Sequence, residues 1–263
     1  MDQTNKIYGH NGLDMYENKL NEYNKYFDWI CFEKTILKQK PNPKTIYLKS
    51  CFLNTHLSEL TKVKDYIIFC CCADHSIQYN ENFNKILEVC KIAFIENKIK
   101  KHTKVNALTV GYATHSPYME KVLLNTPKNT CKKKRILCMW RERESPERLK
   151  AKEWIKDNPV CDFFPEDKGG WEFFIEKVNE YKFVLCPTGF GNDPAPRIFE
   201  VMALGSIPIC FKTLNSYELY QNYPIMWINQ FDDINLDFET DKKFDLEIDL
   251  SIDNYISKLI YSI

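Results

Sequence analysis

Residues 181–211 are the most informative stretch of this chain, because their pattern predicts a strand, a loop, a helix and a second strand in close succession. They read YKFVLCPTGFGNDPAPRIFEVMALGSIPICF. A run rich in apolar residues ends at Cys186, and the stretch with Gly, Asn, Asp and Pro that follows it is typical of a loop. Pro196 suits the first position of a helix, and Gly205 suits the residue just past its end. We therefore expect a βαβ unit of a parallel sheet here.

Apolar runs alternate with amphipathic stretches through the rest of the chain, which predicts an α/β fold with parallel sheets. We expect strands at residues 45–48, 66–72, 105–110, 135–140, 160–164, 183–186, 207–211 and 225–228. Two stretches have apolar residues at helical spacing, residues 81–97 and residues 171–181. In the first of them the apolar face consists of Phe83, Ile86, Leu87, Cys90 and Phe94.

The length of 263 residues fits either one large α/β domain or two compact halves. The polar, Pro-containing stretch 125–134 predicts a linker between halves. We therefore place an N-terminal lobe at residues 1–125 and a C-terminal lobe at 126–263. An apolar pattern of helical spacing within 251–263 predicts a last helix that docks on a core, and it can pack back on the first lobe.

Composition excludes several classes of protein. The 36 basic and 36 acidic residues cancel, so no overall field attracts nucleic acid or a membrane surface. No apolar stretch is long enough for an ordinary membrane span. The N-terminus lacks the pattern of a signal peptide, so we interpret the 11 cysteines as reduced thiols and expect a cytoplasmic protein. Cys70, Cys71 and Cys72 should alternate between the two faces of a strand, which makes them core residues rather than joint metal ligands.

Arg197 and Glu200 are three residues apart and share a face of the expected helix. This helix begins at the carboxyl end of a parallel strand, where open α/β sheets bind ligands. A guanidinium can pair with diphosphate oxygens, and a carboxylate can accept hydrogen bonds from a ribose diol. The pair therefore indicates a nucleotide site. The alternative is an ordinary surface ion pair that contributes only about 0.2–0.5 kcal/mol.

This segment resembles the nucleotide-sugar half of the exostosin-type glycosyltransferases. The resemblance rests on Cys186-Pro187, Gly189, Arg197, Glu200 and Gly205-Ser206-Ile207-Pro208, and it extends over residues 135–234, whereas the first half of the chain matches weakly. It implies a GT-B architecture, with two Rossmann-like lobes and a cleft between them. It also implies inverting transfer of a sugar from a nucleoside diphosphate to a glycan hydroxyl.

The same resemblance assigns roles to individual residues. Arg197 would hold the diphosphate and Glu200 the ribose. The loop from Thr188 to Asp193, with Gly189 and Asn192, would contact the phosphates or the sugar.

A second basic contact is expected from Arg141 or Arg143, which follow the strand at 135–140. The alternative for these two arginines is a solvated helix start with internal ion pairs.

Inverting transfer requires a general base, which should come from the first lobe. Asp74 and His75 follow the strand that ends at Cys72, and we favour Asp74. His115 and His10 are further candidates. Each has a structural alternative, such as a turn cap for the aspartate and an ordinary hydrogen-bonded role for the histidines.

Other fingerprints do not fit. The dinucleotide, P-loop and nucleophile-elbow motifs are missing from the sequence, and there is no convincing Asp-x-Asp for a metal-bound diphosphate. We therefore expect no tightly bound cofactor and no essential metal.

The chain is shorter than the usual catalytic region of the family, and we expect no stalk or anchor. In these respects it resembles the soluble enzymes of large DNA viruses that build capsid glycans in the host cytoplasm. Because those enzymes include xylosyltransferases, UDP-xylose is the first expected donor. A fucosyltransferase-like enzyme that uses GDP-fucose and a non-catalytic binding protein are the alternatives.

Overall fold

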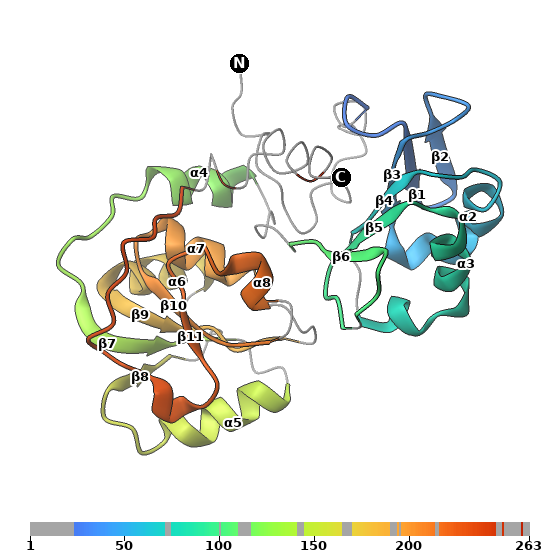
Figure 1. Cartoon of the computed structure of the whole chain (residues 1–263). Coiled ribbons are helices and arrows are strands. Elements are labelled where there is room, and N and C mark those ends of the chain that lie inside the picture. The colour runs from blue at the N-terminus through green and yellow to red at the C-terminus, as the bar shows by residue number, and fades with distance from the viewer. Residues whose placement is uncertain are drawn as a thin grey trace. The chain divides into compact units, whose positions relative to one another are not determined.

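The computed structural model describes residues 24–71, 75–99, 101–109, 117–140, 145–164, 170–189, 194, 196–213, 216–245, 249 and 259. These residues form two compact units (Figure 1). The N-terminal unit comprises residues 24–109 with Leu259, and the C-terminal unit comprises residues 117–249. Each unit is built around a sheet of mainly parallel strands, so the predicted α/β class with two parallel sheets is confirmed.

The described strands of the N-terminal unit form a six-stranded sheet in the order β2-β1-β3-β4-β5-β6. Its strands are β1 (Trp29–Phe32), β2 (Thr35–Lys38), β3 (Thr45–Lys49), β4 (Ile67–Cys71), β5 (Ile92–Ile95) and β6 (Val105–Ala107). Its helices are η3 (Ser50–Phe52), α2 (Leu53–Leu60), η4 (His75–Tyr79) and α3 (Glu81–Val89). Among the described strands of this sheet, β1 and β2 are the one antiparallel pair. Cys70 and Cys71 lie in core clusters on different sides of β4, as their alternation predicts.

Two parts of this unit differ from the expectation. The helix predicted over residues 81–97 ends at Val89, because the backbone of Cys90 is extended and residues 92–95 pair with β4 as strand β5. Phe83 lies in the core as predicted, whereas Phe94 belongs to the strand and packs on the other face of the sheet. The hairpin β1–β2 was not predicted at all, because its two strands have only four residues each.

The described strands of the C-terminal unit form a five-stranded, fully parallel sheet in the order β11-β10-β9-β7-β8. Its strands are β7 (Lys133–Cys138), β8 (Cys161–Phe163), β9 (Tyr181–Leu185), β10 (Ile207–Phe211) and β11 (Met226–Ile228). Its helices are α4 (Pro117–Asn125), α5 (Pro146–Ile155), α6 (Gly170–Glu180), α7 (Arg197–Ala203), α8 (Ser216–Tyr220) and η6 (Phe231–Asp233). The segment 181–211 thus folds as the predicted βαβ unit, β9–α7–β10.

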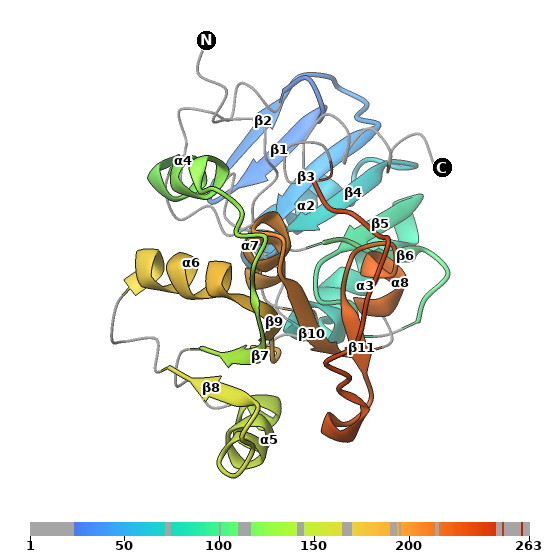
Figure 2. The same cartoon turned by 90° about the vertical axis from the view of Figure 1, so that its left-hand side faces the viewer.

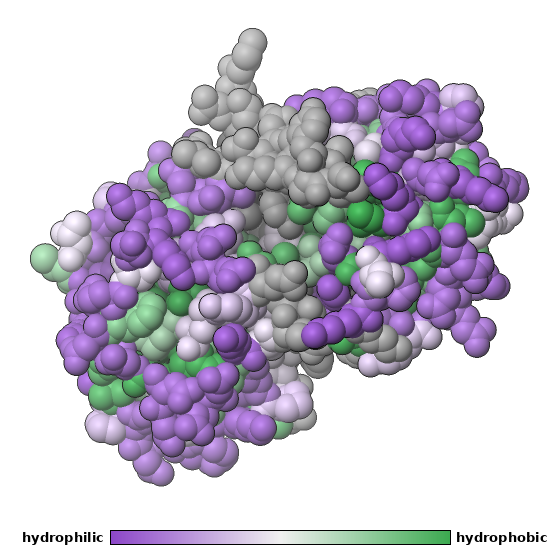
Figure 3. All heavy atoms as spheres, in the orientation of Figure 1, coloured by the Kyte–Doolittle hydropathy of each residue, from purple (hydrophilic) through white to green (hydrophobic). Residues whose placement is uncertain are grey.

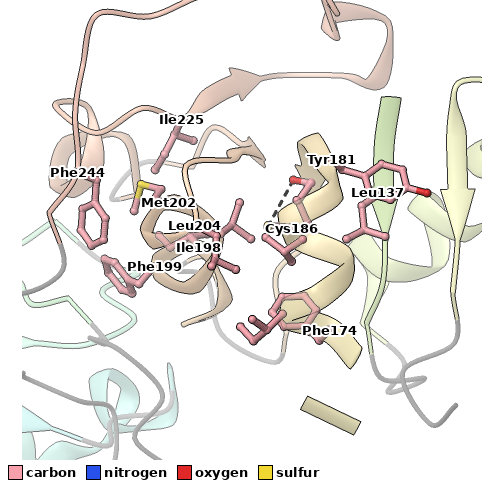
Figure 4. Close-up of a cluster of buried hydrophobic side chains, with 14 of the residues drawn as sticks. Leu137, Phe174, Tyr181, Cys186, Ile198, Phe199, Met202, Leu204, Ile225 and Phe244 are labelled. Carbon is pink, nitrogen blue, oxygen red and sulfur yellow. Dashed lines mark hydrogen bonds between the residues drawn. The ribbon is translucent and has the colours of Figure 1, made fainter. Parts of the chain in front are cut away.

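Helices cover both faces of this sheet. Figure 2 shows α6 and α7 on one side and α5 on the other. On the first side, Ile198, Phe199 and Met202 of α7 meet Phe174 of α6 in a buried cluster (Figure 4). On the second side, Ala151 and Ile155 of α5 pack on a separate cluster of strand residues. The unit is therefore a three-layer sandwich whose α7 is buried nearly all round.

The boundary between the two units lies between residues 109 and 117, which is before the linker expected at 125–134. Helix α4 precedes that linker in the sequence, yet its Leu123 belongs to the core cluster of α6 and α7. An apolar helical face joins the unit whose core covers it, whatever the polarity of the segment that follows. Leu259 packs against the N-terminal core that contains Phe69 and Phe94.

The basic residues 132–135 each hold a structural contact. Lys132 donates to the carbonyl of Asn179 at the C-terminal end of α6 at 2.9 Å, and burial lowers the pKa of its ammonium to about 8. Arg135 forms two hydrogen bonds, of 2.8 and 2.6 Å, with Asp162 of β8, which also accepts one of 2.8 Å from the hydroxyl of Tyr181 in β9. This cluster ties β7, β8 and β9 together.

Asp162→Asn should destabilise the protein at neutral pH and have progressively less effect as the pH falls below about 4. The hydrogen bonds from Arg135 hold the pKa of Asp162 below its ordinary value. A depressed carboxyl pKa contributes stability above the unfolded-state value of about 3.9, and this contribution is lost as the pH falls through the folded-state value. Urea unfolding of both proteins between pH 7 and pH 2.5 measures the difference, and a difference that stays constant would contradict the assignment.

The face of the molecule drawn in Figure 3 is mainly polar where the structure describes it. In the view of Figure 3, hydrophilic residues cover most of the described surface of each unit, and hydrophobic residues form only small patches. Among the residues that the structure describes, no helix has both the length and the apolar character that a membrane crossing requires.

Candidate functional site

The strand order of the C-terminal unit defines where a ligand is expected. From β7 the chain moves to β8 at one edge of the sheet and then returns to β9 on the other side of β7. In an open α/β sheet, the connections that follow such a pair of strands leave in opposite directions and open a crevice at their carboxyl ends. The site is therefore expected where β7 ends at Cys138 and β9 ends at Leu185.

Arg197 lies at this position. Its guanidinium donates a hydrogen bond to the carbonyl oxygen of Met139, the residue that follows β7. The central carbon of the guanidinium also lies 4.8 Å from the ring centroid of Phe174. The first residue of α7 thus places a cation at the carboxyl end of β7, although α7 itself follows β9.

Glu200 is not an exposed member of a surface pair, because only 5% of the residue is accessible to solvent. Its Oε1 accepts a hydrogen bond of 3.2 Å from the indole N–H of Trp171 in α6. A carboxylate removed from water to this extent requires such partners. The alternative of an ordinary solvated Arg–Glu pair is therefore excluded by the burial of Glu200.

The end of α7 is fixed as the sequence predicts. Gly205 has a φ of +72°, a left-handed conformation that favours glycine, and its N–H donates to the carbonyl of Met202 at 2.9 Å. The hydroxyl of the next residue, Ser206, lies 2.9 Å from the carbonyl oxygens of Val178 and Tyr181. These contacts join the end of α7 to the α6–β9 corner and hold the helix against the sheet.

A second set of contacts joins the two loops at the expected crevice. Both carboxylate oxygens of Glu147 accept hydrogen bonds from Thr188, one from its N–H at 2.8 Å and one from its hydroxyl at 3.0 Å. Ser145, the N-cap of α5, donates from its hydroxyl to the carbonyl of Thr188 at 2.9 Å. Thr188 follows β9, whereas Ser145 and Glu147 follow β7.

Burial raises the pKa of the Glu147 carboxyl, and the hydrogen bonds from Thr188 and the charges of Arg148 and Lys150 oppose that effect. The sequence shows Ser145-Pro146-Glu147 as a typical helix start. Nothing in its spacing predicts that this carboxylate reaches the loop after β9.

Gly189 lies close to the start of α5 as well. A Cβ atom at this position would come within 3.6 Å of a terminal guanidinium nitrogen of Arg148. The contact is an ordinary van der Waals distance, so the loop runs directly against this side chain. Arg148 is thus a second arginine at the carboxyl ends of β7 and β9, and sequence reasoning did not select it.

Of the residues selected from the sequence, Thr188, Gly189, Arg197 and Glu200 belong to the loop and helix that follow β9. His75 begins η4 after β4, and its side chain lies outside the described residues. The other selected positions also lie outside them, namely His10, Asp74, Arg141, Arg143, His115, Asn192 and Asp193.

Two further features concern ligands. Within the described ranges, no group of three or more His, Cys, Asp or Glu side chains is placed to hold a metal. A cavity of about 390 Å³ opens between α4 and α6, where Val122, Ile175 and Asn179 contribute to its lining. This cavity is separate from the carboxyl ends of β7 and β9, so we do not assign it to the nucleotide.

The comparisons with known proteins add no assignment. No protein-family model matches the chain, and no curated protein matches it.

Proposed function

We propose that the chain is an inverting, exostosin-like glycosyltransferase of GT-B architecture, which transfers a sugar from a UDP-sugar to a glycan hydroxyl. In this proposal the C-terminal unit binds the donor and the N-terminal unit serves the acceptor. UDP-xylose is the first donor to be tested. No tightly bound cofactor and no essential metal are part of the proposal.

The position of the Arg197 guanidinium at the end of β7 carries the proposal. A guanidinium offers five N–H donors in a planar fork that matches the oxygens of a diphosphate. Helix α7 has only seven residues, so we assign the attraction for phosphate to this side chain rather than to a helix dipole. Glu200, one turn along α7, supplies the carboxylate that accepts hydrogen bonds from the ribose hydroxyls.

The chemistry follows from these roles. The acceptor oxygen forms a bond to the anomeric carbon of the donor sugar while the bond from that carbon to the diphosphate oxygen breaks. Negative charge then develops on the departing UDP, and Arg197 stabilises it. The proton of the acceptor hydroxyl passes to a general base. Asp74 and His75, which follow β4 in the chain, are the candidates for this base.

A panel of nucleotide sugars tests the proposal without knowledge of the acceptor. The protein is incubated with UDP-xylose, UDP-glucose, UDP-galactose, UDP-N-acetylglucosamine and GDP-fucose, and the released nucleotide is measured. Selective release of UDP from one sugar is the expected result, because water can replace the acceptor slowly. Selective release of GDP from GDP-fucose would favour the fucosyltransferase-like alternative. Release from none, without thermal stabilisation by UDP or GDP, would favour a non-catalytic protein.

A chelation experiment tests the metal prediction separately. Activity should be the same in the presence of EDTA and after magnesium or manganese is restored, because Arg197 is proposed to stabilise the leaving diphosphate. The initial rate of UDP release is measured under both conditions. A clear rise on restoring either cation would contradict this part of the proposal.

A further inference from the structure

Every polar group of Thr188 is bonded to the first turn of α5 or to its cap. The N–H and the hydroxyl donate to the two oxygens of Glu147, and the carbonyl accepts from the Ser145 hydroxyl. The same Ser145 oxygen accepts the N–H of Arg148 at 3.2 Å, which caps the helix. One residue of the loop after β9 is thus held by three hydrogen bonds to the segment after β7.

This clamp, formed by Ser145, Glu147 and Thr188, fixes the loop where secondary structure no longer does so. Strand β9 ends at Leu185 and α7 begins only at Arg197. Pro187 has no N–H to donate, and Gly189 restricts the backbone less than any other residue type.

The clamp also has a cost that a purely structural contact could avoid. Glu147 is partly buried, and this burial opposes the ionised form that accepts both Thr188 hydrogen bonds. A neutral side chain could pack here without that penalty. The carboxylate offers two oxygens, one for each of the two Thr188 donors.

We propose that Glu147 is a positioning residue of the donor site, which acts through Thr188 to hold the loop after β9 against the loop after β7. This inference rests on the proposed function. It concerns a residue that the donor itself does not need to touch. The proposed role predicts an effect on donor affinity that exceeds any effect on overall stability.

The test compares four variants and one control variant with the wild-type protein. Glu147→Ala removes both acceptors, whereas Glu147→Gln retains an acceptor for the Thr188 N–H and can donate to its hydroxyl oxygen. Thr188→Val removes the hydroxyl, and Thr188→Ser restores it. Glu153→Ala is the matched control, because Glu153 lies on the same helix and pairs only with Lys156 among the contacts described.

Two measurements are made on each protein, namely UDP affinity by calorimetry and hydrogen exchange of the ligand-free protein at residues 186–190. We expect Glu147→Ala to weaken UDP binding on the order of 10- to 100-fold, the scale seen when a residue that orients a binding group is removed. Exchange should rise at 186–190 while the midpoint of thermal unfolding changes little. In UDP affinity and in hydrogen exchange, Glu147→Gln and Thr188→Ser should be close to the wild type. Thr188→Val should fall between the wild type and Glu147→Ala.

The outcomes separate the two proposals. If wild-type protein does not bind UDP, the proposed function fails and the positioning role fails with it. If wild-type protein binds UDP but Glu147→Ala binds it equally well, the positioning role alone is overturned. The same holds if Glu147→Ala weakens binding only in proportion to a loss of global stability, because Glu147 then acts on the fold and not on the site.

Discussion

Arg197→Ala should weaken the binding of UDP by roughly 10- to 150-fold, the equivalent of about 1.5–3 kcal/mol for hydrogen bonds that involve a charged group. The reason is that the guanidinium lies at the carboxyl end of β7, where the diphosphate is proposed to bind. Turnover of the preferred UDP-sugar should fall at least as much, because the leaving group loses its counter-charge. Calorimetry with UDP and the rate of UDP release measure the two effects.

A comparison of UDP with uridine shows whether Arg197→Ala affects the diphosphate contacts alone or nucleotide binding in general. Wild-type protein should bind UDP far more tightly than uridine, and Arg197→Ala should remove most of that preference. Arg197→Lys should recover only part of it, because an ammonium lacks the planar fork of the guanidinium. Lys156→Ala, a change at the far end of α5, serves as the control for charge. An unchanged preference for UDP in Arg197→Ala would contradict the assignment.

Glu200→Ala should weaken UDP binding by a similar factor, roughly 10- to 150-fold, because a charged acceptor for the ribose is lost. The decisive comparison uses 2′-deoxy-UDP. Wild-type protein should prefer UDP over the deoxy nucleotide, and Glu200→Ala should bind both with nearly equal affinity. Calorimetric titration of the two nucleotides into both proteins gives the coupling free energy between Glu200 and the 2′-hydroxyl directly.

Two further variants control for the burial of Glu200. Glu200→Gln keeps an acceptor for the Trp171 indole and tests the charge alone. Trp171→Phe removes the indole donor and leaves the carboxylate in place. If Glu200→Ala retains the wild-type preference for UDP over 2′-deoxy-UDP, Glu200 does not bind the ribose, and its role is limited to the packing of α7.

The fold could be predicted from the sequence wherever local signals and tertiary packing agree. The segment 181–211 has a loop signal and a helix-ending glycine between apolar runs, and it folds as β9, α7 and β10. The helix predicted over 81–97 shows the opposite case. Residues 92–95 continue its apolar pattern, but strand pairing with β4 competes with the helix and takes them into the sheet. The periodicity of a short apolar run does not show whether the run forms a helix or a strand.

The site could be predicted only in the part that lies within one βαβ unit. Arg197 and Glu200 stand out because they occupy neighbouring turns of one helix beside a distinctive loop. Glu147 and Arg148 do not stand out, since they are separated from Thr188 by about forty residues of sequence and by the order of the strands. Their contacts depend on β7 and β9 being neighbours in the sheet, which no local pattern encodes. The three hydrogen bonds that join Thr188 to Ser145 and Glu147 are therefore visible only in the structure.

Hydrogen exchange with and without saturating UDP tests most directly whether a nucleoside diphosphate binds at the carboxyl ends of β7 and β9. The proposal predicts that UDP protects backbone amides in peptides covering residues 139–148 and 186–200. It also predicts that peptides from α4 and from residues 175–180 of α6, which line the separate cavity, remain unchanged, and that Arg197→Ala abolishes the protection. Protection confined to other parts of the chain, or none at a UDP concentration that saturates a millimolar site, would contradict the proposal.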